Sequence, residues 1–179
     1  GKDGSLHAGA GQTMYSHGLA AITMCETYGL SKDDRIRKSA QGAIRFIEAA
    51  QSQKTGSWVY QPAPQAESGD TSVLGWQLMA LKSAQMAGLE VKPATLEGAR
   101  KWLKAVSKGS KGGQFCYNIA SGPSPTMTAV GLLCTQYLGA GRSEGPIVEG
   151  MEYLMSQLPN PSARNCYYWY YATQVMHNL

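Results

Sequence analysis

The feature that most constrains the fold is an internal repeat of about 56 residues. A first glycine series opens three apolar runs, at Gly18, Gly75 and Gly131. A second series follows it in phase, at Gly42, Gly98 and Gly150, and a third series contains Gly56-Ser-Trp58 and Gly113-Gln-Phe115. Self-similarity at a fixed period predicts stacked copies of one supersecondary unit, each covering the apolar face of the next. Because glycine in a helix costs about 1 kcal/mol against alanine, its recurrence at equivalent places suggests close helix–helix approach. A fourth unit begins at the run Tyr167–Tyr171.

Each unit predicts two helices of different character. The first is apolar nearly all round, as in residues 73–81, which is typical of a helix buried on every side. The second is amphipathic: Ile36, Ala40, Ile44 and Ile47 form one stripe, and the intervening arginines and lysines face water. No segment alternates with period two, so strands should be few and short. We therefore predict an all-α fold, a partial α/α toroid of about three and a half helical hairpins.

Length and charge limit the function classes. The 179 residues fit a single domain, 1–179, which could be a fragment of a longer protein. A dispersed net charge of +4 argues against nucleic-acid binding. No apolar run reaches the roughly 18 residues of a membrane span. We expect no transmembrane segment and slightly favour the cytoplasm, although a signal or anchor could precede Gly1.

Cysteine and histidine spacing predicts neither a metal site nor a cofactor. The four cysteines form no Cys-x-x-Cys pair, and the histidines stand at no ligand spacing from them. We expect buried free thiols. The glycine-rich segment 108–113 lacks the Gly-Lys-Ser/Thr ending of a phosphate-binding loop and predicts a mobile loop.

One segment supports a family resemblance. Phe46-Ile47, then Gln51, then Gly56-Ser-Trp58 resembles the QW motif of terpene cyclases. The chain from about Tyr15 onward resembles the squalene-cyclase and prenyltransferase repeat family, especially bacterial squalene-hopene-cyclase-like repeat proteins of unassigned function. In that family the glutamine caps helix ends, stacks on the tryptophan and ties neighbouring units together.

The family's chemistry does not transfer residue by residue. The resemblance aligns the acid motif of the cyclases with Glu67-Ser-Gly-Asp-Thr-Ser72, where Gly69 replaces the proton-donating aspartate. It places Ser72 where prenyltransferases have a zinc-binding cysteine. Asp70 and Glu67 remain candidate catalytic acids or bases. The alternative for Asp70 is a plain helix N-cap.

Tyrosines and tryptophans are the candidate ligand-binding residues. The rings near the starts or faces of the first helices could line a concave face and hold an isoprenoid or a sugar chain. They are Tyr15, Trp76, Tyr168, Trp169 and Tyr171. The alternative is that the rings only fill space between helices.

Two functions follow as hypotheses. The first is a noncatalytic binding or scaffolding domain that uses this concave aromatic face. The second is an enzyme acting on an isoprenoid or carbohydrate, with Asp70 as acid or base. The partner of the first would be an apolar small molecule or a protein, and two open arcs could pair as a homodimer.

Overall fold

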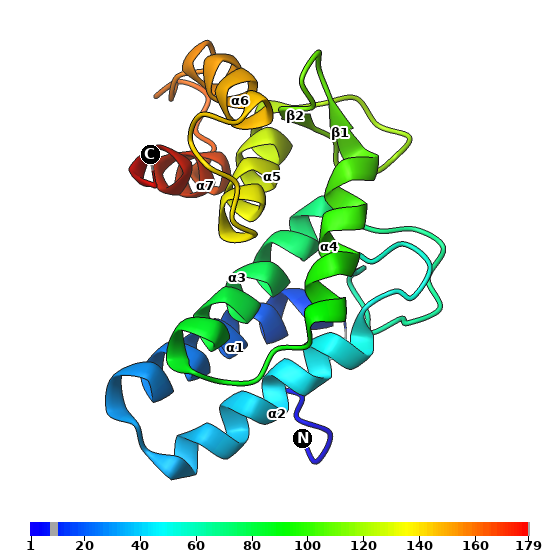
Figure 1. Cartoon of the computed structure of the whole chain (residues 1–179), viewed down its shortest axis with the longest axis vertical. Helices are drawn as coiled ribbons and strands as arrows, with labels where there is room; N and C mark the ends of the chain where they lie inside the picture. The colour runs from blue at the N-terminus through cyan, green and yellow to red at the C-terminus, as the bar shows by residue number, and fades with distance from the viewer. Residues whose placement is uncertain (8–10, 179) are drawn as a thin grey trace. The chain divides into compact units, whose positions relative to one another are not determined.

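The computed structural model describes residues 1–7 and 11–178 and confirms an all-α architecture (Figure 1). Within that range there are seven helices and one two-stranded antiparallel sheet. Their bounds are α1 (Thr13–Ser31), α2 (Asp34–Ala50), α3 (Thr71–Ala87), α4 (Pro93–Val106), β1 (Ser107–Lys108), β2 (Gln114–Phe115), α5 (Pro125–Tyr137), α6 (Gly145–Met155) and α7 (Cys166–His177). None of the described helices is both long enough and apolar enough to cross a bilayer.

The chain forms two compact units, Gly1–Ala99 and Arg100–Leu179. In the first unit α1 packs against both α2 and α3, and Figure 1 shows these helices side by side. In the second unit α5 packs against α6, α7 and β2. In the second unit the first helix of a hairpin, α5, is therefore the one with most packed neighbours, as its all-round apolar sequence requires.

Burial follows the predicted alternation of helix types. In α3, 13 of 17 residues are buried. In α2 the buried residues form one stripe, consisting of Ala40, Ala43, Ile44, Ile47 and Ala50. The arginines of α2 lie on its solvent-exposed face, so this amphipathic helix is an outer helix, as its sequence pattern predicts.

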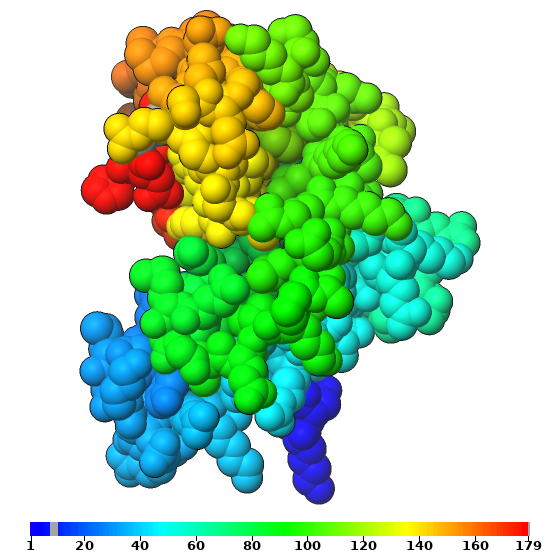
Figure 2. Space-filling view, viewed as in Figure 1, coloured from blue at the N-terminus to red at the C-terminus, as the bar shows by residue number. Residues whose placement is uncertain are grey.

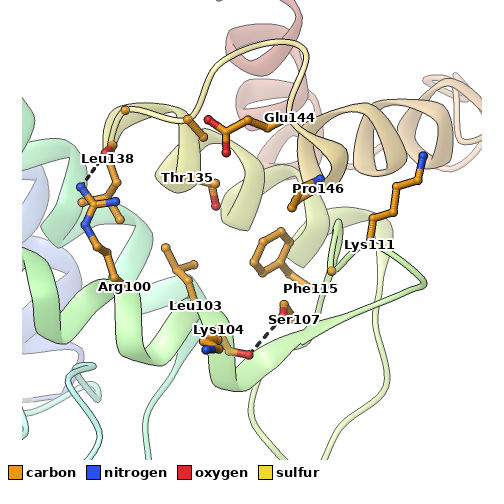
Figure 3. Close-up of a pocket in the computed structure, with 13 residues that line it drawn as sticks. Arg100, Leu103, Lys104, Ser107, Lys111, Phe115, Thr135, Leu138, Glu144 and Pro146 are labelled. Atoms are coloured by element: carbon orange, nitrogen blue, oxygen red, sulfur yellow. Dashed lines mark hydrogen bonds between the residues drawn. The ribbon is translucent and has the colours of Figure 1, made fainter.

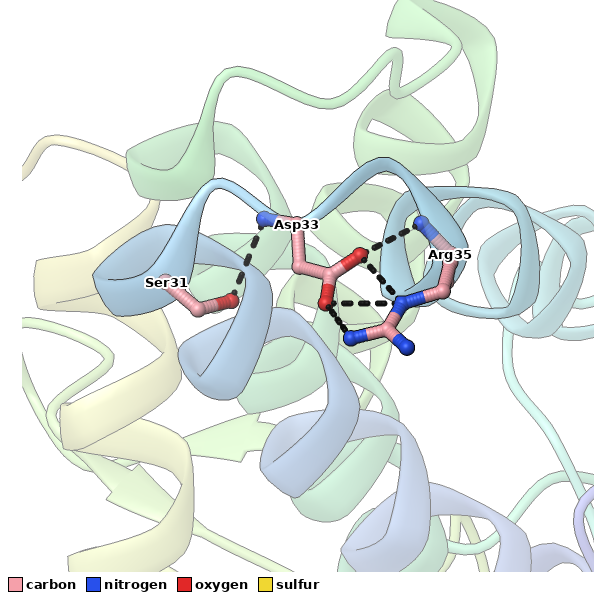
Figure 4. Close-up of polar contacts among 3 residues, drawn as sticks. All are labelled: Ser31, Asp33 and Arg35. Carbon is pink, nitrogen blue, oxygen red and sulfur yellow. Dashed lines mark hydrogen bonds and ion pairs between the residues drawn. The ribbon is translucent and has the colours of Figure 1, made fainter.

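Local polar contacts determine where α2 begins (Figure 4). The Asp33 carboxylate accepts hydrogen bonds from the backbone N–H of Arg35 at 2.8 Å and from its guanidinium at 2.6 Å. The Ser31 hydroxyl accepts from the N–H of Asp33. The Arg35 guanidinium lowers the pKa of Asp33, so the cap stays charged. Arg35 is exposed and Asp33 is partly exposed, and their role is to define the helix start.

The repeated glycines mark two kinds of close approach. A Cβ at Gly18 in α1 would lie 2.9 Å from the Cβ of Trp76 in α3, which is the helix–helix contact that recurrence predicted. The second series instead meets loop glycines. Gly56, at φ +79°, approaches so closely that its Cβ would sit 2.1 Å from the Gly98 carbonyl oxygen.

The loop-on-helix contact occurs three times in the described part of the chain. Gly113 lies against Gly150 in the same way, and Gly4 lies against Gly42. Gly4-Ser5-Leu6 is therefore an earlier copy of the loop element, which the sequence analysis did not identify. In the second glycine series the close partner is a loop backbone, and within the described ranges only Gly150 also approaches a neighbouring helix, at Leu132 of α5.

The QW-like segment, residues 46–58, links the end of α2, the loop that follows it and the start of α4. The Gln51 amide donates to the Gly56 carbonyl at 2.8 Å and to the Thr95 carbonyl, in the first turn of α4, at 2.9 Å. The Trp58 indole N–H donates to the Ile47 carbonyl at the end of α2. These bonds anchor the long connection between α2 and α3, which projects as a surface lobe (cyan to turquoise in Figure 2).

Candidate functional site

The two predicted acids occupy different environments. Asp70 is 4% exposed, and its Oδ1 accepts hydrogen bonds from Ser72 N at 2.8 Å and Val73 N at 3.2 Å. It is the N-cap of α3. Glu67 is an exposed residue that forms an ion pair with Lys54. One carboxylate is thus inside the fold and bound to its own helix, whereas the other lies in solvent.

The predicted aromatic residues fall into separate clusters. In the first unit, Tyr15 stacks on Tyr60 with ring centroids 5.5 Å apart, and Trp76 meets Tyr15 edge-on at 6.4 Å. The structure therefore brings Tyr15 and Trp76 together and adds Tyr60, which the sequence analysis did not select for ligand binding. The other three candidates belong to the second unit.

Those three residues of α7 differ in accessibility. Tyr171 is fully buried and packs against the rings of Tyr167 and Tyr170. The Tyr168 hydroxyl donates to the Gln157 carbonyl at 2.7 Å. Tyr168 and Trp169 both line a shallow, largely polar pocket at the start of α7. Only Tyr168 and Trp169 of this group therefore border a surface hollow.

A second cavity, of about 420 Å³, lies wholly within the second unit (Figure 3). We call it the α4–α6 cavity. It is bounded by α4, the β1–β2 connection, the end of α5 and the start of α6. Its apolar lining residues are Leu103, Phe115, Leu138, Ala140 and Pro146. Three cationic residues, Arg100, Lys104 and Lys111, surround this lining, together with one acid, Glu144. An apolar floor with a basic border suits an amphipathic ligand.

Helix patterning explains how the floor is built. Leu103 lies on the apolar stripe of α4 and points inward. Phe115 ends β2, and its ring packs on Gly131 of α5: a Cβ there would sit 2.2 Å from the ring. Gly131 thus makes room for Phe115, and the first glycine series has a direct role in shaping the cavity.

The border carries a positive electrostatic bias. Arg100 donates to the Leu138 carbonyl at 2.6 Å, which positions its guanidinium beside the cavity. Glu144 is engaged locally, since it accepts from Gly141 N at 2.7 Å. Over the described part of the chain, neither Lys104 nor Lys111 forms an ion pair. The positive end of the α6 dipole lies at the same border.

The β1–β2 connection is held by one carboxylate. Glu149 of α6 accepts hydrogen bonds from the backbone N–H groups of Ser110, Lys111 and Gly113 and from the Ser110 hydroxyl, at 2.6 to 3.0 Å. These donors lower the pKa of Glu149 to about 2, led by the Ser110 hydroxyl. The sequence predicted a mobile loop here; the structure shows a loop bonded to α6.

The thiols and metal ligands give no second site. Cys25, Cys116 and Cys134 are buried as predicted, and burial raises the pKa of Cys25 to about 12. Cys166 is exposed, so the expectation of burial was wrong for this first residue of α7. Among the described residues no group of three or more His, Cys, Asp or Glu side chains is arranged to hold a metal ion.

No residue of the α4–α6 cavity was among the candidates predicted from the sequence. Arg100 and Lys104 alternate with apolar residues as on the solvent face of an amphipathic helix, and Glu149 belongs to no motif in the sequence. The recurring Gly-x-aromatic pattern at Gly113–Phe115 was the one available signal. Comparison of the chain with protein-family models, curated proteins and solved structures gave no match.

Proposed function

We propose that this chain is a noncatalytic binding domain whose ligand is a small molecule with an apolar chain, held in the α4–α6 cavity. The observation that carries the proposal is the cavity itself: a volume of about 420 Å³ floored by Leu103, Phe115 and Leu138. Such a volume suits a short apolar chain, and concave apolar pockets with few polar groups are the usual form of small-molecule sites.

The condition of Asp70 supports binding rather than catalysis. Its carboxylate accepts two backbone N–H groups and the Ser72 hydroxyl, which is the pattern of a helix cap. Glu67, the other candidate acid, pairs with Lys54 at the surface. No observation favours the alternative of an isoprenoid or carbohydrate enzyme based on Asp70.

We further propose that the helices form part of an α/α toroid of the squalene-cyclase and prenyltransferase kind. Two features support this assignment: the alternation of buried and amphipathic helices, and the Gln51 amide joining the α2 end to the α4 start. The Tyr15, Tyr60 and Trp76 cluster, as part of the concave aromatic face, is a secondary candidate for contact with a ligand or protein partner.

Calorimetric titration of the full chain with 1-hexanol and 1-octanol tests the proposed function. We expect saturable one-to-one binding, with octanol up to about fifteenfold tighter, because each of its two additional methylenes contributes roughly 0.8 kcal/mol when buried. Ala140→Trp should fill the cavity and abolish binding. Ala120→Trp, at an exposed loop position outside the cavity, is the matched control. Equal binding by both variants, or none by the native chain up to the solubility limit, would contradict the proposal.

A further inference from the structure

The border of the α4–α6 cavity carries information about the polar end of the ligand. Arg100, Lys104 and Lys111 line the cavity on different sides of Phe115, and the Lys111 side chain extends outward at the border (Figure 3). Glu144 is the one acid that lines the cavity, and its carboxylate is bonded to Gly141 N. The border therefore has an excess of two positive charges. A ligand without a charged head would not neutralise them.

Lys111 depends on an unusual support. It lies on a segment rich in glycine, where Gly109 has φ +91°, and such backbone is conformationally permissive. The Lys111 N–H donates to Glu149 at 3.0 Å, and the aliphatic part of its side chain packs about 3.4 Å from where a Cβ of Gly145 would stand. Two points on α6 thus fix the position of this lysine.

Glu149 is suited to hold the segment permanently. Its carboxylate receives four hydrogen bonds, three of them from consecutive or near-consecutive backbone amides. With a pKa of about 2 it is charged throughout the physiological pH range. A glutamine at this position would replace one acceptor oxygen by an NH2 group that faces backbone N–H donors. At least one of the hydrogen bonds that hold the loop 110–113 on α6 would then be lost.

We infer that the ligand of the cavity carries an anionic head, a phosphate or carboxylate, and that Glu149 is the residue that positions Lys111 to receive it. This inference rests on the proposed function, because it assigns the polar end of the same ligand. It has a counterintuitive consequence. Simple charge counting says that removing a nearby negative charge strengthens anion binding, whereas a positioning role says that it weakens it.

The test compares octyl phosphate, octanoate and 1-octanol as calorimetric probes of the full chain. We expect the native chain to bind at least one of the two anions tenfold or more tightly than octanol. Comparing the phosphate with the carboxylate identifies the preferred head. Glu149→Gln should weaken binding of that anion by about fivefold or more, a larger loss than it causes for octanol. Glu152→Gln, an exposed acid on the same helix, should not weaken anion binding.

A double-mutant cycle identifies the route of the effect. Lys111→Gln should give a similar loss for the anion, and combining it with Glu149→Gln should add little, because both changes remove the same contact. Should Glu149→Gln fail to fold, Lys104→Gln and Lys111→Gln still test the anionic head. Lys101→Gln, on α4 but outside the cavity lining, is their control.

The results separate the two proposals. A native chain that binds no octanol contradicts the proposed function. A native chain that binds octanol but prefers neither anion overturns the anionic head. Anion binding that is unchanged or tighter in Glu149→Gln overturns the positioning role.

Discussion

At the scale of single residues, Asp70 shows how one carboxylate can suggest two functions. Its place in an acid-like motif suggests catalysis, but its oxygen is bonded to Ser72 and Val73 at the start of α3. The sequence already contained the cap, because capping involves only the next three residues. The hydrogen bonds that Glu149 accepts were not predictable in this way, since their donors lie 36 to 39 positions away along the chain.

The cap assignment predicts a specific pair of variants. Asp70→Asn should change the free energy of unfolding by about 1 kcal/mol or less, because asparagine is an equally good N-cap. Asp70→Ala should cost about 1–2 kcal/mol, since it leaves two α3 amides without their acceptor. Urea denaturation measures both. If Asp70→Asn were as damaging as Asp70→Ala, the negative charge would have a role beyond capping.

At the scale of elements, glycines at equivalent repeat positions have unequal neighbours. Among the described residues, a Cβ at Gly42 would meet only the Gly4 Cα, at an ordinary 3.5 Å. A Cβ at Gly150 would lie 2.5 Å from the Gly113 carbonyl oxygen and 2.6 Å from a Leu132 methyl. Both glycines are helical and belong to one series, so periodicity alone assigns them the same role.

The structure predicts opposite outcomes for these two positions. Gly42→Ala should stabilise the chain by about 0.5–1 kcal/mol, because alanine favours helix and the site has room. Gly150→Ala should destabilise it by about 1–3 kcal/mol, because a backbone carbonyl cannot yield easily. Unfolding midpoints in urea compare the two. Similar shifts in the same direction would refute the contacts described for this series.

Element types were predictable from sequence, whereas their partners were not. The all-round apolar pattern of residues 73–81 and the stripe of Ile36 to Ile47 identified inner and outer helices, because hydrophobic period depends on a single helix. The pairing of Gly56 with Gly98, or of Phe115 with Gly131, depends on tertiary packing. Cavity lining arises from such pairings, so the sequence analysis selected aromatic rings and missed Lys104 and Leu103.

At the scale of the whole molecule, the chain was expected to be one domain, 1–179, and its residues group as Gly1–Ala99 and Arg100–Leu179. The α4–α6 cavity belongs entirely to the second unit. The proposed binding function therefore requires only contacts within that unit. The aromatic candidates are divided between the units, with Tyr15 and Trp76 in the first.

The central claim, that the α4–α6 cavity is the binding site, is tested most directly by methyl NMR of the full chain titrated with octyl phosphate. We predict shifts that saturate at one equivalent and centre on the methyl groups of Leu103, Thr135 and Leu138, with Leu19 and Leu30 of α1 unaffected. Shifts centred instead on the neighbours of Tyr15 and Trp76, or no saturable shift at all, would contradict the account.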